Sequence, residues 1–145
     1  MDNIHLVSCV GDGLNLEFVP EEIVTEEICL AACTNNGLAF KFVPKHLITE
    51  DLFLITCSDK VFALRFVPEE MRTEKMCLIA CIKNGYALRN VPKNLITEKM
   101  CLFACASQGC AIKYVPENLL TKNLCSIACA NDRNASKYIP KIMES

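Results

Sequence analysis

The 145-residue sequence has no tryptophan, only two histidines, and no large excess of one charge. Its longest apolar stretches, such as the one around Met76–Ile82, are far shorter than the roughly 20 residues that span a bilayer, so no membrane association is expected. A net charge of −2 argues against broad electrostatic binding of nucleic acid. There is no P-loop, dinucleotide fingerprint or nucleophile elbow, and His5 and His46 stand at unrelated positions. We therefore expect neither an enzyme nor a cofactor.

Cysteine is abundant, with eleven residues. A disulfide scaffold is not the expected explanation, because the count is odd and the first residues, MDNIHLVSCV, lack the basic region and apolar core of a secretory signal. The composition favours a reducing, cytoplasmic location. Export by a specialised secretion route stays open as an alternative.

An internal repeat of 24 residues organises the chain. Counted from each proline, threonine recurs at position 5, cysteine at position 13 and alanine at position 19. A fixed period of this length is the signature of stacked repeats, and no linker interrupts it. We predict one domain over residues 1–145, with five full copies and partial ends. The repeat frames start near Pro20, Pro44, Pro68, Pro92, Pro116 and Pro140.

Each copy has the signals of a helical pair. The threonine is a typical N-cap, about ten mostly apolar residues follow, and Gly37, Gly85 or Gly109 suits a left-handed C-cap. A second, shorter helical piece ends at Val-Pro, because the residue before proline avoids the α region. The pattern predicts an all-α fold, an αα-solenoid whose first helix is apolar nearly all round and therefore buried. A leucine-rich solenoid is the alternative at this period.

The segment TEKMCLIACIKNGYALRNVPKNL, which begins at Thr73, resembles the tandem repeats of an uncharacterised domain family. That family has the approximate pattern L-x-x-D-x-x-x-V-L-x-A-V-x-x-N-G-x-A-L-x-Y and occurs in host-associated bacteria and large DNA viruses. The resemblance covers nearly the whole chain, and Asn84–Leu88 is its most specific part. It implies helical repeats without an assigned activity, and it makes a role in host or symbiont interaction an expectation. One copy departs from the pattern at Ser58–Val61, which puts its C-cap in doubt.

The two ends of the array differ in polarity. Asn134, Ser136 and Lys137 give the last copy a polar face, whereas the first helix has no preceding copy to cover it. We predict that this first helix contacts a partner, for which a second copy of the chain is one candidate. Its uncovered apolar residues are Ile4, Leu6, Val7 and Val10.

Recurrent CxxxC pairs suggest a second function. Residues four apart share a helix face, so paired thiolates can bind a soft ion such as Cu(I). The competing interpretation is packing, because free cysteine behaves as a small buried hydrophobe and Phe53 replaces the first cysteine of one copy. The pairs are Cys29/Cys33, Cys77/Cys81, Cys101/Cys105 and Cys125/Cys129.

A basic residue stands three positions before most of the prolines, and Glu17 replaces it in the first copy. Stacking would align these side chains into a docking surface for a protein partner. RNA binding is the less favoured alternative, because Phe18, Phe42 and Phe66 fit the apolar core pattern and therefore do not interleave with the charges. The predicted function is a non-enzymatic interaction scaffold that docks through this series, the first helix or the irregular copy at Phe53–Phe62. The basic residues are Lys41, Arg65, Arg89, Lys113 and Lys137.

Overall fold

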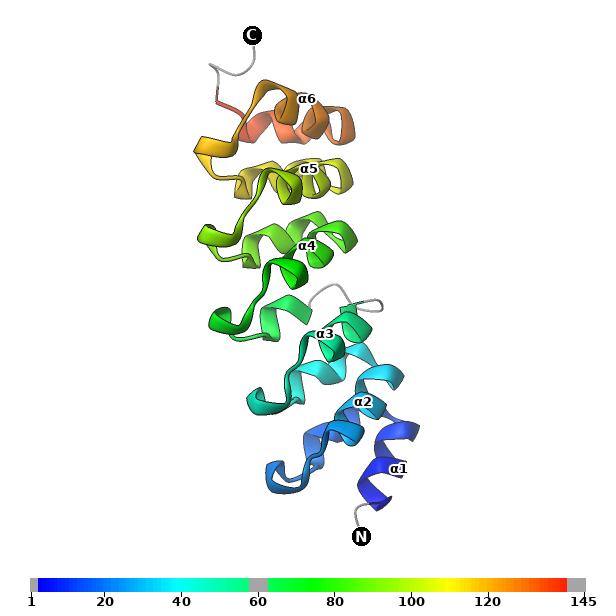
Figure 1. Cartoon of the computed structure of the whole chain (residues 1–145). Helices are drawn as coiled ribbons and strands as arrows, with labels where there is room; N and C mark the ends of the chain where they lie inside the picture. The colour runs from blue at the N-terminus through cyan, green and yellow to red at the C-terminus, as the bar shows by residue number, and fades with distance from the viewer. Residues whose placement is uncertain (1–2, 58–62, 141–145) are drawn as a thin grey trace. The chain divides into compact units, whose positions relative to one another are not determined.

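The computed structural model describes residues 3–57 and 63–140 (Figure 1). In these ranges every regular element is a helix and none is a strand. The all-α prediction is therefore confirmed. The leucine-rich alternative needs a strand in each copy and is wrong for the described residues. The chain divides into two compact units, Met1–Met71 and Arg72–Ser145.

Each unit repeats one order of elements, in which an α-helix (α) is followed by a 3₁₀-helix and then by a single 3₁₀ turn (both η). The first unit contains α1 (Asn3–Gly11), η1 (Gly13–Phe18), η2 (Glu21–Ile23), α2 (Glu26–Asn35), η3 (Gly37–Phe42), η4 (Lys45–Leu47), α3 (Glu50–Cys57), η5 (Ala63–Phe66) and η6 (Glu69–Met71). The second contains α4 (Glu74–Lys83), η7 (Gly85–Asn90), η8 (Lys93–Leu95), α5 (Glu98–Ser107), η9 (Gly109–Tyr114), η10 (Glu117–Leu119), α6 (Lys122–Asn131) and η11 (Arg133–Tyr138).

The α-helices begin where the repeat pattern predicts. In α4 the Thr73 hydroxyl accepts a hydrogen bond from the Met76 amide at 3.2 Å, and the other complete copies make the same N-cap at 3.1–3.2 Å. The second helical piece is also confirmed, but it is a 3₁₀-helix. It ends at Val91, whose φ of −82° and ψ of 127° are the extended backbone that a following proline favours.

The glycine at position 17 has a different role from the left-handed C-cap predicted from the sequence. Among the described residues no glycine has a positive φ, so a left-handed C-cap is the wrong explanation. Asn84 instead caps η7, since its Oδ1 accepts from the Tyr86 amide at 2.9 Å, and Gly85 is the first residue of that helix. A Cβ on Gly85 would lie 2.2 Å from the carbonyl oxygen of Ala104 in the next copy. Glycine is therefore required because two backbones approach closely, and Gly13 and Gly109 make the same approach to Ala32 and Ala128.

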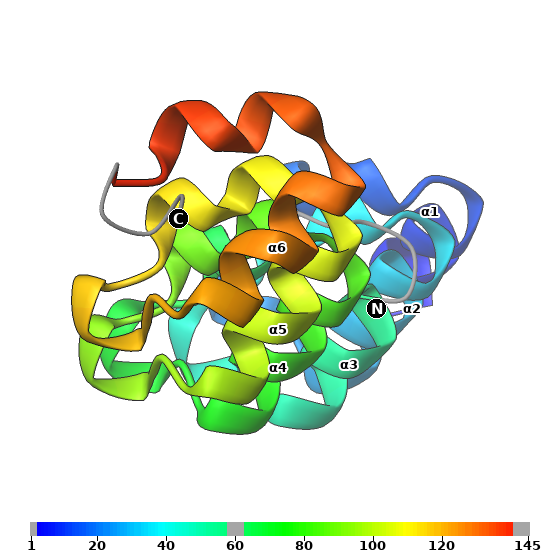
Figure 2. The ribbon, with the colours of Figure 1, turned by 90° about the horizontal axis from the view of Figure 1, so that it is seen from above.

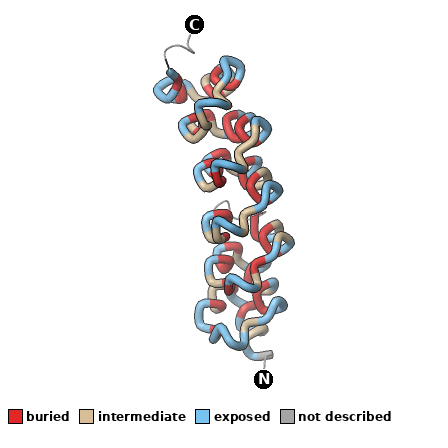
Figure 3. The backbone as a smooth tube through the Cα atoms, turned by 60° about the vertical axis from the view of Figure 1, so that its left-hand side comes forward, coloured by how far each residue is buried: buried red, intermediate tan, exposed pale blue. Residues whose placement is uncertain are grey.

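Stacking buries one stripe of each α-helix. Within each unit consecutive α-helices pack together, and so do the 3₁₀-helices that follow them. Figure 2 shows α4, α5 and α6 lying over one another, and Figure 3 shows buried positions recurring in every copy. In α4 the buried residues are Met76, Cys77, Ala80 and Cys81. The expectation that the helix is buried all round is wrong, because the outward side is open: Leu102, for example, is 41% exposed.

In the two copies that have asparagine at position 15, Asn35 and Asn131, its side chain joins neighbouring copies. Asn131 accepts from the Gly109 amide at 2.7 Å and donates to the Ala106 carbonyl at 2.9 Å. These two backbone groups belong to a helix start and a helix end, where orphan donors and acceptors need partners. Asn35 makes the equivalent bonds to Gly13 and Val10. Only a close stack allows one side chain to satisfy both groups.

The irregular copy repacks locally. Phe53 is fully buried and lies edge-on to Phe40, with ring centroids 6.2 Å apart. Thr56 replaces the usual alanine and donates within α3 to Leu52 at 2.8 Å, so its hydroxyl is satisfied in the core. The predicted interaction surface at Phe53–Phe62 is thus not available at Phe53. The doubtful C-cap at Ser58–Val61 lies outside the described residues.

Candidate functional site

The basic residues at position 21, here called the basic series, are all exposed. Each lies near the end of a six-residue 3₁₀-helix or of its described part, two residues before the core valine or isoleucine. Lys41 and Arg65 belong to the first unit, whereas Arg89, Lys113 and Lys137 belong to the second. The sequence analysis therefore identified surface groups that recur at one place in the repeat.

Aromatic rings accompany these charges, contrary to the expectation. The Lys41 ammonium lies 4.8 Å from the centroid of the Phe42 ring, and the Arg65 guanidinium lies 5.3 Å from that of Phe66. Phe42 and Phe66 are half-buried and Phe18 is 76% exposed, so they are not core residues. Positions 19 and 20 of η3 and η5 are buried, whereas the ring at position 22 belongs to the last residue of each helix and lies outside the core. A cation over a ring is an attractive pair that still presents its charge to a partner.

Lys113 has the densest aromatic surroundings. Its ammonium lies 5.1, 5.4 and 6.0 Å from the ring centroids of Tyr114, Tyr138 and Tyr86, which come from three consecutive copies. A hydrogen bond with Tyr114 raises the pKa of Lys113 above its ordinary value, and the other two tyrosines act in the same direction. The group is therefore a cation over the whole physiological pH range.

A thiol–carboxylate pair lies beside this cluster. Cys110 donates from Sγ to Oδ2 of Asp132 at 3.3 Å, while the amide of Asn134 donates to Oδ1 at 2.9 Å. The backbone bond from Asn134 is the main cause that lowers the pKa of Asp132, and the thiol contributes to it. The pair links η9 to η11, and it leaves Cys110 as a donor rather than a thiolate.

The cysteines of the CxxxC pairs lie in the core, except for the half-buried Cys129. Burial raises the pKa of Cys81 and of Cys105 to about 12, and that of Cys77 to about 11. A thiolate, which is the metal-binding form, is strongly disfavoured at these places. Among the described residues no three or more histidine, cysteine or acidic side chains form a group that would hold a metal.

Sequence spacing missed how the thiols relate between copies. Cys81 interacts electrostatically with Cys77 of its own helix and also with Cys101 of the next one. Cys105 is related to Cys101 and Cys125 in the same way. The CxxxC thiols of the second unit thus form a ladder in which neighbours in the same helix and in the next one raise the pKa of Cys81 and Cys105, which i, i+4 spacing alone does not predict.

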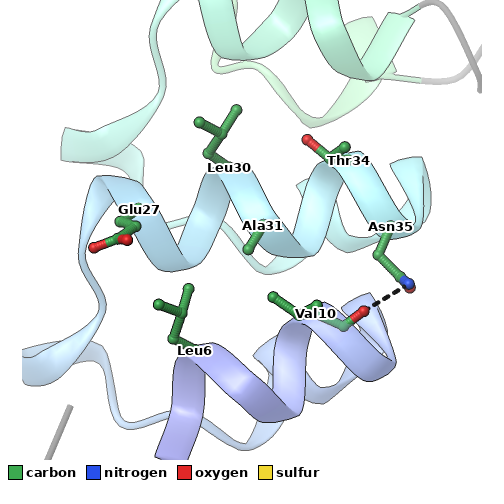
Figure 4. Close-up of a pocket in the computed structure, with 7 residues that line it drawn as sticks. All are labelled: Leu6, Val10, Glu27, Leu30, Ala31, Thr34 and Asn35. Atoms are coloured by element: carbon green, nitrogen blue, oxygen red, sulfur yellow. Dashed lines mark hydrogen bonds between the residues drawn. The ribbon is translucent and has the colours of Figure 1, made fainter. Parts of the chain in front are cut away.

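The first helix presents the predicted apolar surface. Ile4 is 73% exposed, although residues at the same position of the later α-helices are buried. Val7 and Val10 are exposed as well, whereas Leu6 is half-buried. Leu6 and Val10 line an open groove of about 530 Å³ together with residues of α2, and Ala31 points toward α1 from that helix (Figure 4). The structure therefore joins this surface to α2, which the sequence analysis did not include.

No helix within residues 3–57 and 63–140 is long and apolar enough to span a membrane.

Comparison with known proteins identifies one family. Residues 9–48 match the model of a domain of unknown function (DUF4116), a stretch that runs from the end of α1 to the residue before Thr49. No curated protein and no solved structure matches the chain. What the comparisons identify is therefore an uncharacterised domain over residues 9–48.

Proposed function

We propose that the protein is a non-enzymatic scaffold of stacked helical repeats that binds a protein partner through the basic series and its neighbouring rings. The observation that carries the proposal is the recurrence of an exposed cation at one position of every copy after the first, with rings against Lys41, Arg65 and Lys113. Packing within the array does not require these charges, because they lie outside the core. Arginine and aromatic residues are the types that most often dominate interface energies.

A reducing, cytoplasmic location and a role in host or symbiont interaction belong to the same proposal. Nine of the eleven cysteines are buried as small core residues, and this use of cysteine is typical of a reducing compartment. Pairing of two copies through α1 is a further part of it, supported by the exposure of Ile4.

Soft-metal binding is the second candidate function, and the ladder of neighbouring thiols in the second unit favours it. Binding Cu(I) would require deprotonation of buried thiols, which costs free energy that the metal has to supply. Titration of the reduced protein with Cu(I) against a chelator, with thiols counted before and after, tests this function. Retention of several ions with loss of thiol reactivity would favour it over the scaffold.

The scaffold proposal can be tested with an array of peptides of acidic, neutral and basic composition. We expect the wild-type protein to bind a subset of acidic peptides, and a variant with Lys41, Arg65, Arg89 and Lys113 changed to glutamine to lose that binding. The matched control neutralises four exposed cations elsewhere and should keep it. The control residues are Lys83, Lys99, Lys122 and Arg133. Equal binding by both variants would show that the basic series is not the docking surface.

A further inference from the structure

Two surface hollows occur at the same place in the repeat, one in each unit. The hollow of the second unit measures about 540 Å³ and lies between η8 and the end of η9. That of the first unit measures about 310 Å³ and lies between η2 and the end of η3. Position by position, Ile96, Tyr114 and Val115 of the former correspond to Val24, Phe42 and Val43 of the latter. The apolar walls are therefore alike.

The charges around these hollows are inverted. Lys93 stands where the first unit has Glu21, and Glu117 stands where it has Lys45. The second-unit hollow is lined by two lysines, Lys93 and Lys113, and one glutamate, which gives 2 − 1 = +1. Glu17, Glu21 and Lys45 line the other and give 1 − 2 = −1. We call them the basic hollow and the acidic hollow.

The lysines of the basic hollow present their charge to solvent. Lys113 is exposed and stands among three tyrosine rings, which hold its ammonium beside the hollow. Lys93 is exposed at the start of η8, and no ion pair involves it in the described part of the chain. By contrast, Lys45 of the acidic hollow forms an ion pair with Glu70 at 2.5 Å. Of these two hollows, the basic one therefore combines an excess of positive charge with an apolar wall.

We propose that the basic hollow binds an extended acidic segment of a partner protein, with a carboxylate at Lys93 and Lys113 and a neighbouring apolar side chain against Ile96 and Val115. This inference rests on the proposed scaffold function and specifies the partner's chemistry. An acidic peptide fits better than a nucleic acid, because Glu117 lines the same hollow and would repel successive phosphates. A carboxylate followed by an apolar side chain matches both the two cations and the wall behind them.

A fluorescent peptide of alternating glutamate and leucine is the probe, with an otherwise identical glutamine–leucine peptide as its control. In fluorescence anisotropy at low salt, the wild-type protein should bind the acidic peptide and not the control. The variant K93Q/K113Q should bind the acidic peptide about tenfold more weakly, because it loses two solvent-exposed charge pairs with the peptide. The matched variant K45Q, in the acidic hollow, should leave the affinity unchanged.

A second, charge-reversal variant distinguishes loss of the binding site from misfolding. K93E/K113E should reverse the preference, so that a lysine–leucine peptide now binds better than the glutamate–leucine peptide. Unchanged binding in K93Q/K113Q, an equal loss in K45Q, or tighter binding of a single-stranded oligonucleotide than of the acidic peptide would each overturn the proposal. The two proposals can fail separately, because Lys93 lies outside the basic series. If the glutamine variant of the basic series loses binding to the peptide array while K93Q/K113Q binds the acidic peptide as tightly as wild type, the basic hollow is rejected and the scaffold proposal stands.

Discussion

Replacement of Gly85 by alanine tests the explanation of the stack most directly. A Cβ at this position would lie 2.2 Å from the oxygen, 2.9 Å from the carbonyl carbon and 3.2 Å from the Cα of Ala104. Ordinary contacts begin at 3.4 Å, so η7 and α5 would have to separate by about 1 Å. A gap of that size forfeits a quarter to a half of the dispersion energy of the atoms that line it. We expect the free energy of unfolding to fall by about 3 kcal/mol, at the upper end of overpacking effects.

Urea denaturation followed by circular dichroism measures this change. G11A is the matched control, because a Cβ on Gly11 meets nothing within 4 Å, and we expect it to change stability by less than 1 kcal/mol. G85N separates the two explanations of the glycine, since a left-handed cap tolerates asparagine better than alanine whereas a close approach does not. If G85A stays within 0.5 kcal/mol of wild type, or if G85N is clearly the milder change, the close-approach argument is refuted.

Three further predictions concern the contacts between copies, the buried thiols and the first helix. N131A should lose about 2 kcal/mol in the same assay because the Gly109 amide loses its acceptor, whereas N94A at an exposed site should change little. Burial raises the pKa of Cys81 and its neighbours to about 11–12, so native thiols should resist modification until denaturant is added. Stability should also fall as pH rises above about 9, where unfolded thiols ionise and folded ones do not, by about 1.4 kcal/mol per thiol at pH 10. Sedimentation should detect self-association that I4K abolishes, and a monomer at all concentrations would contradict pairing through α1.

Sequence reasoning predicted the α-helices well because their signals are local. Thr73 and the acidic residue after it mark a helix start within a few residues, and the same pattern recurs in the following copies. The glycine was misassigned because two explanations share one sequence signal. A left-handed cap and a close approach both require glycine after a helix, and only the position of Ala104 in the next copy separates them.

The candidate surface was predicted in part. The basic series follows from its spacing alone, but the rings around Lys113 come from three copies and meet only in the stack. Phe18, Phe42 and Phe66 were misplaced because hydrophobicity suggested core positions, whereas each is the last residue of its 3₁₀-helix and lies half-buried or exposed. The two hollows were not predicted at all, since each is formed by segments about twenty residues apart.

The positions that set the packing between copies differ from the exposed positions at which the copies vary in charge. Positions 17 and 12, occupied in the second unit by pairs such as Gly85 and Ala104, fix the distance between backbones wherever this pair is present. Positions 1 and 21 lie outside the core, so burial does not constrain their charge. The exchange of Glu21 for Lys93 and of Lys45 for Glu117 is therefore a difference that packing alone does not explain. In a protein built from similar copies, differences in charge at exposed positions allow one copy to bind a ligand that another copy does not bind. The basic hollow contains two such differences, Lys93 and Glu117.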